Sequence, residues 1–261
     1  VVVETRTGAN GVVATTELLR AAPDGHTILL VSMGMMTVSP QIGKIPYDVE
    51  RDLTPIGNAA GVYNVLVVKG DSPYKTWQSV AEGAKKTPDK LTCATVGPGS
   101  SQQLACALFM SLTGTKITQV PYRGGAPAIT DMVGGRVDMM FGNMPEFMGQ
   151  IKSGGLRAIA FGAADASPLL PDVPVINTTG LKDFVIHNWF GVVAPGGMSA
   201  EMQRRWNDEL NRALNSAEVK KQFDDRGMQG LPGSLALFDA QMKTDRVKWG
   251  KIIKDFDIRA E

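Results

Sequence analysis

Hydrophobic positions along the chain follow two different periods. Short apolar runs at 27–32 and 91–96 have the length and composition of buried strands. Longer stretches at 12–22, 77–84 and 238–256 place apolar residues three or four positions apart, which predicts amphipathic helices. Strands that alternate with helices are typical of an α/β fold.

One predicted strand leads into a helix through a turn that carries almost no side chains. The stretch V-P-Y-R-G-G-A-P-A at 120–128 ends a predicted buried strand at Tyr122, turns at Gly124 and Gly125, and begins a helix near Pro127. The unpaired N–H groups and the dipole at the start of a helix both favour an anion. The sequence therefore predicts a site for a small carboxylate, built from main-chain groups.

A second loop repeats this arrangement after the strand at 91–96. Ser100 or Ser101 is expected to cap the helix that follows. The dinucleotide fingerprint G-x-G-x-x-G is incomplete because Gln102 stands where its third glycine belongs, so we set a nucleotide site aside. The weakly polar stretch 33–39 is predicted to be a loop. The helix after Ser101 is expected to bury the apolar residues at helical spacing, namely Leu104, Ala107, Leu108 and Leu112.

Composition narrows the range of functions. The 261 residues, 43% of them hydrophobic, are enough for two compact lobes with a core each. The 27 basic and 26 acidic side chains are interspersed, and the net charge is +1, which gives no indication of a nucleic-acid partner. No apolar run approaches the length of a membrane span.

Cys93 and Cys106 are too few for a disulfide framework and lack the spacing of a redox or zinc motif. We favour two buried free thiols. A disulfide is the alternative, since one cysteine falls on a predicted strand and the other on the helix that follows it.

Groups suited to catalysis are scarce. His26 falls in the turn P-D-G-H-T and is interpreted as a solvated turn residue rather than a general base. For His187 we favour packing or hinge contacts over a place in a cleft, because no serine, cysteine or paired carboxylate stands near it in the sequence. The motifs G-x-S-x-G and H-E-x-x-H are both missing from the sequence. We therefore expect no catalytic residue, no metal and no cofactor.

Several longer segments resemble one known family. The chain is similar to the Bug, or TctC-type, solute-binding proteins of the tripartite tricarboxylate transporters, with the segments in the family's order and spacing over essentially the whole sequence. The matching segments are V-V-V-E-T-R-T-G-A at 1–9, A-A-P-D-G-H-T-I-L-L at 21–30, P-Y-D-V-E-R-D-L-T-P-I at 46–56, V-P-Y-R-G-G-A-P-A at 120–128, G-G-R-V-D-M-M-F at 134–141, L-P-D-V-P at 170–174 and W-F-G-V-V-A-P-G-G at 189–197.

The resemblance implies a type II periplasmic-binding-protein fold, with two lobes, a hinge and a ligand cleft between the lobes. Lobe one would comprise 1–62 plus 188–261, and lobe two 63–187. Family members have a further strand and helix before V-V-V-E, so lobe one is expected to lack its first strand and helix. The stretch V-V-V-E itself is expected in a central strand, and ligand binding by this chain is expected to be impaired.

The function implied by the resemblance is that of a periplasmic receptor. It would capture a small organic carboxylate and deliver it to the membrane subunits of a tripartite tricarboxylate transporter, without performing a reaction and as a monomer. A sensor module that reports ligand occupancy to a signalling protein is the alternative, and an enzyme built on this fold is a third.

The family's ligand-binding positions carry over residue by residue. Tyr122 and Phe190 are either pocket walls or core residues. Arg123 invites the role of a carboxylate clamp, although we favour binding by the loop backbone. The predicted ligand-binding residues are Ser32, Met35, Gly97, Gly99, Ser100, Ser101, Gln103, Tyr122, Gly124, Gly125, Gly142, Asn143 and Phe190.

At three of these positions the sequence departs from common family patterns. Gln103 stands where histidine is frequent, and Gly142 where aspartate is frequent. Because an ammonium group needs an anion or a carbonyl cluster, the loss of the aspartate argues against an α-amino acid ligand. Met35 stands where a small polar residue is usual in the family. Together with Met36 it offers the ligand an apolar, deformable surface, which favours an aromatic or longer aliphatic carboxylate.

Overall fold

The computed structural model describes residues 1–6, 8–186 and 188–260. The chain divides into two compact units, each with its own sheet. The first unit comprises Val1–Gly61, Trp189–Asp225 and Gln229–Glu261, and the second comprises Val62–Asn188 and Arg226–Met228.

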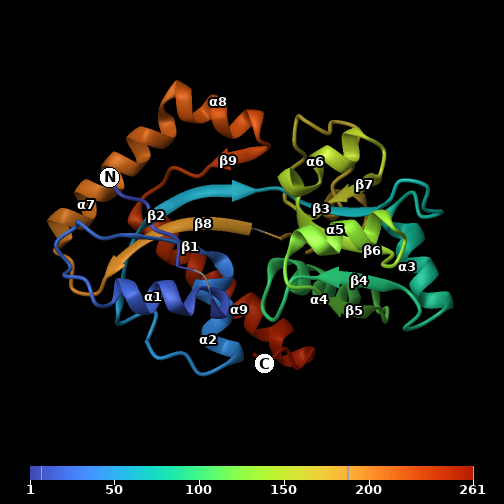
Figure 1. Cartoon of the computed structure of the whole chain (residues 1–261), viewed down its shortest axis with the longest axis horizontal. Coiled ribbons are helices and arrows are strands. Elements are labelled where there is room, and N and C mark those ends of the chain that lie inside the picture. Colours follow the sequence, from blue (N-terminus) through green and yellow to red (C-terminus); the bar gives the residue numbers. More distant parts are fainter. Residues whose placement is uncertain (7, 187, 261) are drawn as a thin grey trace. The chain divides into compact units, whose positions relative to one another are not determined.

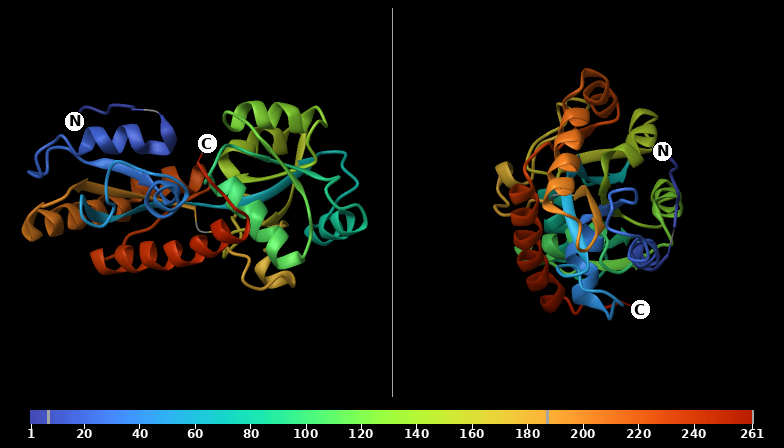
Figure 2. Two further views of the ribbon diagram at one scale, coloured as in Figure 1. Left: turned by 90° about the horizontal axis from the view of Figure 1, so that it is seen from below. Right: turned by 90° about the vertical axis from the view of Figure 1, so that its left-hand side faces the viewer.

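The first unit is built on a four-stranded sheet in the order β1-β8-β2-β9. The left panel of Figure 2 shows α9, in red, along one face of these strands and α1, in blue, on the other. The strands are β1 (Leu29–Ser32), β2 (Leu53–Val62), β8 (Asn188–Pro195) and β9 (Met228–Gly230), and the helices are η1 (Ala9–Gly11), α1 (Val12–Leu18), η2 (Gly34–Val38), α2 (Ser39–Ile42), α7 (Ala200–Asn215), α8 (Ala217–Asp225) and α9 (Leu235–Asp255).

Large apolar side chains hold the first unit together. The rings of Trp189 and Phe238 meet edge to face, with centroids 5.3 Å apart, and both side chains are buried. The indole N–H of Trp249 points at the sulfur of Met33, 3.1 Å away. The predicted C-terminal helix is confirmed, and Ser234 caps its start by accepting a hydrogen bond from the N–H of Leu237.

The second unit carries a five-stranded sheet in the order β5-β4-β6-β3-β7 (Figure 1). Strand β4 runs parallel to both of its neighbours, whereas β3 runs antiparallel to β6 and β7. The strands are β3 (Asn64–Lys69), β4 (Thr92–Thr95), β5 (Thr118–Pro121), β6 (Met139–Asn143) and β7 (Leu156–Phe161), and the helices are α3 (Trp77–Lys86), α4 (Ser101–Thr113), α5 (Gly125–Val133), α6 (Met144–Lys152) and η3 (Asn177–Thr179).

Apolar side chains line both faces of the second sheet. One cluster includes Val65, Met132 and Phe147 and joins the sheet to α5 and α6. On α4, the ring of Phe109 contacts the rings of Phe141 and Phe184, with centroids 5.7 and 6.1 Å away. Burying this apolar surface is the main force that fixes the helices on the sheet.

Four predictions from the sequence need correction. The stretch V-V-V-E forms no strand, and residues 1–6 are exposed. The strand that was expected to be buried up to Tyr122 ends at Pro121 and is an edge strand with exposed ends. The stretch 33–39 is mostly helical rather than a loop, because Met36 and Val38 turn into the core. Leu112 is exposed, although the other three apolar residues expected on its helix face are buried.

Candidate functional site

Three helices of the second unit begin at the same edge of its sheet. Strands β4, β5 and β6 are parallel neighbours, and β4 and β5 end level because the register pairs Thr95 with Pro121. Each strand leads directly into a helix, α4, α5 or α6. Because a helix start carries unpaired N–H groups, α4 and α5 offer main-chain donors at this edge, whereas at α6 the N–H of Met144 donates to the carbonyl of Tyr63 at 2.9 Å and Pro145 has no N–H.

The loop before α4 is ordered by its own polar groups. The hydroxyl of Ser100 accepts a hydrogen bond from the N–H of Gln103 at 3.2 Å, which confirms Ser100 as the cap. In return, Oε1 of Gln103 accepts from the N–H of Gly99 at 2.8 Å. Gly97 adopts φ +107°, a conformation that favours glycine, and among the described residues no heavy atom beyond its two chain neighbours lies within 4 Å of the place where its Cβ would be. The hydroxyl of Ser101 donates to Gln102 at 3.2 Å.

The loop before α5 offers main-chain groups at a second helix start. Gly124 is the cap, with φ +148°, and Gly125 is the first helical residue. Gly124 has no side chain, so the cap residue itself leaves the first N–H groups of this helix uncapped. Pro127, expected early in the helix, is its third residue and carries no N–H, so the free donors of the first turn come from the residues before it.

Tyr122 and Arg123, the two residues before this turn, differ in their contacts. The hydroxyl of Tyr122 donates to Oδ2 of Asp131 at 3.0 Å and so points at α5, the helix that follows it. Desolvation, followed by the contact with Asp131, raises the pKa of Tyr122, which keeps the hydroxyl protonated. Arg123 is exposed, and it takes part in none of the ion pairs that the described residues form.

The third helix start, at α6, brings in a carboxylate that the sequence analysis did not single out. Nδ2 of Asn143 donates to Oε1 of Glu146 at 2.7 Å, and Oδ1 of Asn143 accepts from Nδ2 of Asn188 at 2.5 Å. Oε2 of Glu146 lies 2.9 Å from the place where a Cβ on Gly125 would be. The spacing Asn143-x-x-Glu146 at a helix start was the available signal, since a capping residue is often followed by glutamate three positions later.

The environment of Glu146 alters its acidity. Solvent reaches the residue, but the atoms around the carboxyl desolvate it and raise its pKa, while the hydrogen bond from Asn143 acts in the opposite direction. A negative charge beside the start of α5 also weakens the attraction of that helix for a second anion.

Position 142 offers only main-chain groups, because the space for a side chain there is taken by the core. A Cβ at this position would lie 2.6 Å from Cζ of Phe147, and Phe147 is fully buried. The side-chain direction at 142 therefore leads into the apolar cluster under α6.

The predicted residues of the first unit form a group of their own. Ser32 pairs with Phe190 in the register of β1 and β8. The hydroxyl of Ser32 accepts a weak hydrogen bond from the N–H of Met35 at 3.4 Å. The side chain of Met35 lies over Gly11, where a Cβ would be 2.4 Å from its terminal methyl group. The structure brings Ser32, Met35 and Phe190 together within this unit.

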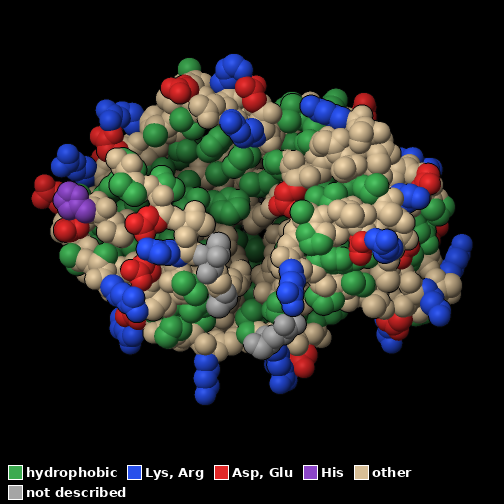
Figure 3. All heavy atoms as spheres, in the orientation of Figure 1, with side chains coloured by type: hydrophobic (Ala, Val, Ile, Leu, Met, Phe, Trp, Pro, Cys, Tyr) green, Lys and Arg blue, Asp and Glu red, His purple; other side chains and the backbone are tan. Residues whose placement is uncertain are grey.

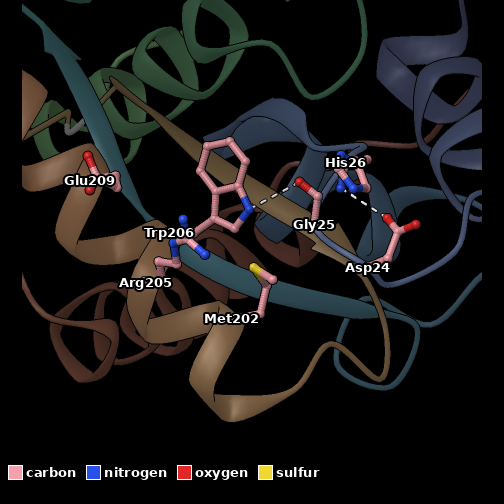
Figure 4. Close-up of a pocket in the computed structure, with 7 residues that line it drawn as sticks. All are labelled: Asp24, Gly25, His26, Met202, Arg205, Trp206 and Glu209. Atoms are coloured by element: carbon pink, nitrogen blue, oxygen red, sulfur yellow. Dashed lines mark hydrogen bonds between the residues drawn. The ribbon is translucent and has the colours of Figure 1, made fainter.

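A pocket of about 440 Å³ lies in the first unit, and none of the predicted ligand-binding residues lines it (Figure 4). The indole N–H of Trp206 donates to the carbonyl of Gly25 at 3.2 Å. His26 is exposed, which confirms its interpretation as a solvated turn residue. Its main-chain N–H donates to Oδ1 of Asp24 at 3.0 Å. The lining residues are Asp24, Gly25, His26, Met202, Arg205, Trp206 and Glu209.

The two cysteines are buried and free, as the sequence analysis favoured. The pKa of Cys106 is raised well above its ordinary value, first by its contact with Cys93 and then by burial. His187 lies outside the described residues.

No helix within 1–6, 8–186 and 188–260 combines the length and the apolar character that crossing a bilayer requires. Among the same residues, no group of three or more histidine, cysteine or acidic side chains is placed to hold a metal ion. On the face shown in Figure 3, basic and acidic side chains are scattered rather than gathered into patches.

Comparison with solved structures defines the class of protein. A structure described as R. palustris Rpa4515 with adipate is 27% identical and matches with a TM-score of 0.89, over all of this chain and 87% of that chain. The structure of the periplasmic binding protein BugD is 30% identical and matches with a TM-score of 0.83, over all of this chain and 88% of that chain. The expected two-lobed periplasmic-binding-protein fold is confirmed.

The sequence comparisons identify the family. Residues 1–258 match the family described as tripartite tricarboxylate transporter family receptor. Protein BugT of Bordetella pertussis (strain Tohama I) is 34% identical over 232 residues, which are 87% of this chain and 70% of BugT. The chain belongs to the TctC family of solute-binding receptors, and the resemblance to the Bug proteins is confirmed.

Proposed function

We propose that this chain is the periplasmic solute-binding receptor of a tripartite tricarboxylate transporter, and that it captures a small organic carboxylate for delivery to the membrane subunits. The observation that carries the proposal is the convergence of the starts of α4, α5 and α6 at one sheet edge. Main-chain N–H groups and helix dipoles at such an edge stabilise a carboxylate without a catalytic group. The adipate in a structural neighbour supports the same ligand class.

In this proposal the carboxylate is bound by the loops at Gly97–Ser101 and Gly124–Gly125 of the second unit. Ser32, Met35 and Phe190 of the first unit stay predicted ligand contacts, to be tested by their own variants. The family is described as a receptor family, so no turnover of the ligand is expected.

The first experiment is a thermal-shift screen of the chain against mono-, di- and tricarboxylates, each paired with its amide analogue. A ligand at about a hundred times its dissociation constant stabilises the folded state by roughly 2.7 kcal/mol, which raises the Tm by roughly 5 °C. A hit among the acids whose amide fails supports the anion site. If only neutral or cationic compounds raise the Tm, the proposal is wrong.

Proline substitution then tests whether a helix start holds the carboxylate. Ser101 is the first residue of α4 and follows a residue in extended conformation, so Ser101→Pro fits the backbone while deleting one free N–H. Ser101→Ala removes the hydroxyl alone. We expect the proline variant to bind the acid several-fold more weakly than the alanine variant.

The matched control is Ala200→Pro, the same change at the first residue of α7, which begins in the first unit after a residue of similar conformation. Its affinity for the acid should equal that of the parent chain. Equal binding by Ser101→Pro and Ser101→Ala would contradict a role for the main chain of α4.

A further inference from the structure

The side chain of Glu146 lies between the start of its own helix, α6, and the start of α5. It is the third residue of α6, and its Oε2 lies against Gly125, the first residue of α5. An alanine side chain at 125 would reach to 2.9 Å from this oxygen, so glycine leaves the space that the carboxylate fills. The side-chain carboxylate of Glu146 therefore lies beside the main-chain donors of α5 that are proposed to hold the ligand.

The orientation of Glu146 is set by a chain of side-chain amides. Asn188 donates to Asn143 at 2.5 Å, which directs the amide nitrogen of Asn143 towards Glu146. That nitrogen then donates to Oε1 at 2.7 Å. One carboxylate oxygen of Glu146 is thereby held by a hydrogen bond.

The other oxygen, Oε2, has no hydrogen bond within the part of the chain that the structure describes. Nor does Glu146 take part in an ion pair among those residues. An ionised carboxylate accepts hydrogen bonds and donates none. A group that binds next to Oε2 must therefore bring a donor, and a bare carboxylate placed there meets a like charge.

Resting on the proposed function, we infer that Glu146 is a specificity-determining residue, which accepts a hydrogen bond from a hydroxyl or ammonium group on the carbon next to the ligand's carboxylate. A carboxylate held at the start of α5 has its neighbouring carbon within reach of Oε2, because Oε2 lies at the first residue of that helix. Glu146 then supplies the acidic group that glycine at position 142 does not. This reverses the expectation, drawn from Gly142 alone, that α-amino acids are excluded.

The test uses three carbon skeletons, each as the plain, the 2-hydroxy and the 2-amino acid. They are succinate, malate and aspartate; adipate, 2-hydroxyadipate and 2-aminoadipate; and phenylacetate, mandelate and phenylglycine, with both enantiomers of each chiral acid. Titration calorimetry on the full chain gives the ratio of dissociation constants within each skeleton. For the skeleton that binds, we expect a donor-bearing acid to bind about tenfold or more tightly than the plain acid.

Two variants identify the donor. Glu146→Ala removes the acceptor and should abolish the preference for both substituents. Glu146→Gln keeps a neutral acceptor and removes the charge, so a preference for the hydroxy acid should partly survive, whereas a preference for the amino acid should fall to about threefold or less. Glu82→Gln is the matched control, because Glu82 is an exposed residue of α3 in the same unit, and it should leave every ratio unchanged.

The outcomes separate this inference from the function on which it rests. If the parent binds plain and donor-bearing acids equally, or if Glu146→Ala keeps the preference, the role of Glu146 is refuted while the carboxylate receptor stands. If the parent binds no acid of any skeleton, the proposed function fails and this inference with it. Thermal melting of each variant checks folding, and Glu146→Asp, which withdraws the carboxylate by one methylene, replaces any variant that does not fold and should weaken the preference in the same direction.

Discussion

The side-chain oxygen of Gln103 accepts a hydrogen bond from the main-chain N–H of Gly99, 2.8 Å away and one helical turn earlier. The side chain of Gln103 thus links the loop before α4 to the first turn of that helix. The N–H of Gly99 is therefore already hydrogen-bonded within the protein, and this contact orders the loop before a ligand binds.

Gln103→Ala should loosen this loop and weaken carboxylate binding by several-fold, since one net hydrogen bond of about 1 kcal/mol is lost. Gln103→Glu keeps an acceptor of the same reach but adds a negative charge, and should weaken binding by tenfold or more. Calorimetry with the best acid measures both. Gln78→Ala, on the exposed side of α3, is the control, and undiminished binding by Gln103→Glu would place the anion elsewhere.

The caps at Ser100 and Ser234 allow a comparison of two helix starts. Each hydroxyl accepts from the N–H three residues later. Replacing either serine with alanine should cost about 1 kcal/mol and lower the Tm by roughly 2–4 °C. Urea unfolding measures the loss, and a variant as stable as the parent would show that the cap hydrogen bond contributes nothing at that helix.

The pair Trp189 and Asp245 is a polar contact inside the first unit's core. The indole N–H donates to Oδ2 of Asp245 at 2.6 Å, and both residues are buried. Asp245→Ala leaves a buried donor without this acceptor and should cost about 1–3 kcal/mol in urea unfolding. Asp245→Asn keeps an oxygen at the same reach, so its loss should be clearly smaller; equal losses would argue that the charge, not the hydrogen bond, matters.

Asp52 should make stability depend on acid pH. The hydrogen bond from Arg51, followed by one from the N–H of Asp48, lowers the pKa of Asp52 from 3.8 to about 2. Because the folded pKa lies below the unfolded one, the contribution is fully present above about pH 4 and is lost as the pH falls from there through 2.

The measurement is stability between pH 6 and pH 2 for the parent and for Asp52→Asn. The variant should be less stable at pH 6, and its difference from the parent should shrink as the acid limit is approached. Asp71→Asn, which removes an exposed aspartate that is paired with Lys69, is the control. A constant difference across the whole range would show that the side-chain charge of Asp52 is not involved.

Cys93 and Cys106 should resist a thiol reagent in the folded chain. Both are fully buried, and the raised pKa of Cys106 keeps its reactive thiolate scarce. Ellman's reagent should report no rapid reaction in buffer and two thiols in denaturant. Absence of titratable thiols in denaturant would indicate that the pair is joined by a disulfide in the preparation used.

Local chemistry accounts for the parts of the molecule that could be predicted. The starts of α4, α5 and α9 follow from a capping serine or a glycine turn within a few residues of each helix, so their sequence signals are sufficient. The convergence of three loops follows in turn from parallel strand order, which the alternation of strands and helices already favours.

Contacts between distant segments account for what was missed. The stretch at 33–39 has no helix signal of its own, and it is helical because Met33 and Met36 reach a core completed by Trp249, more than two hundred residues later. Glu146 looks like an ordinary first-turn glutamate until α5 is placed beside α6. The spacing of residues within one segment cannot reveal which distant segment will pack against it.

The ring of Phe147 under Gly142 also restricts which side chains position 142 can accept. A single change of Gly142 to aspartate would drive the new side chain against a ring that has no free space. Room for an aspartate would need a smaller residue at 147 first, and that change alone would leave a cavity in the core. Neither change is neutral by itself, so positions 142 and 147 are expected to tolerate substitution only as a pair, whereas the acidic group at Glu146 is accommodated without disturbing the ring.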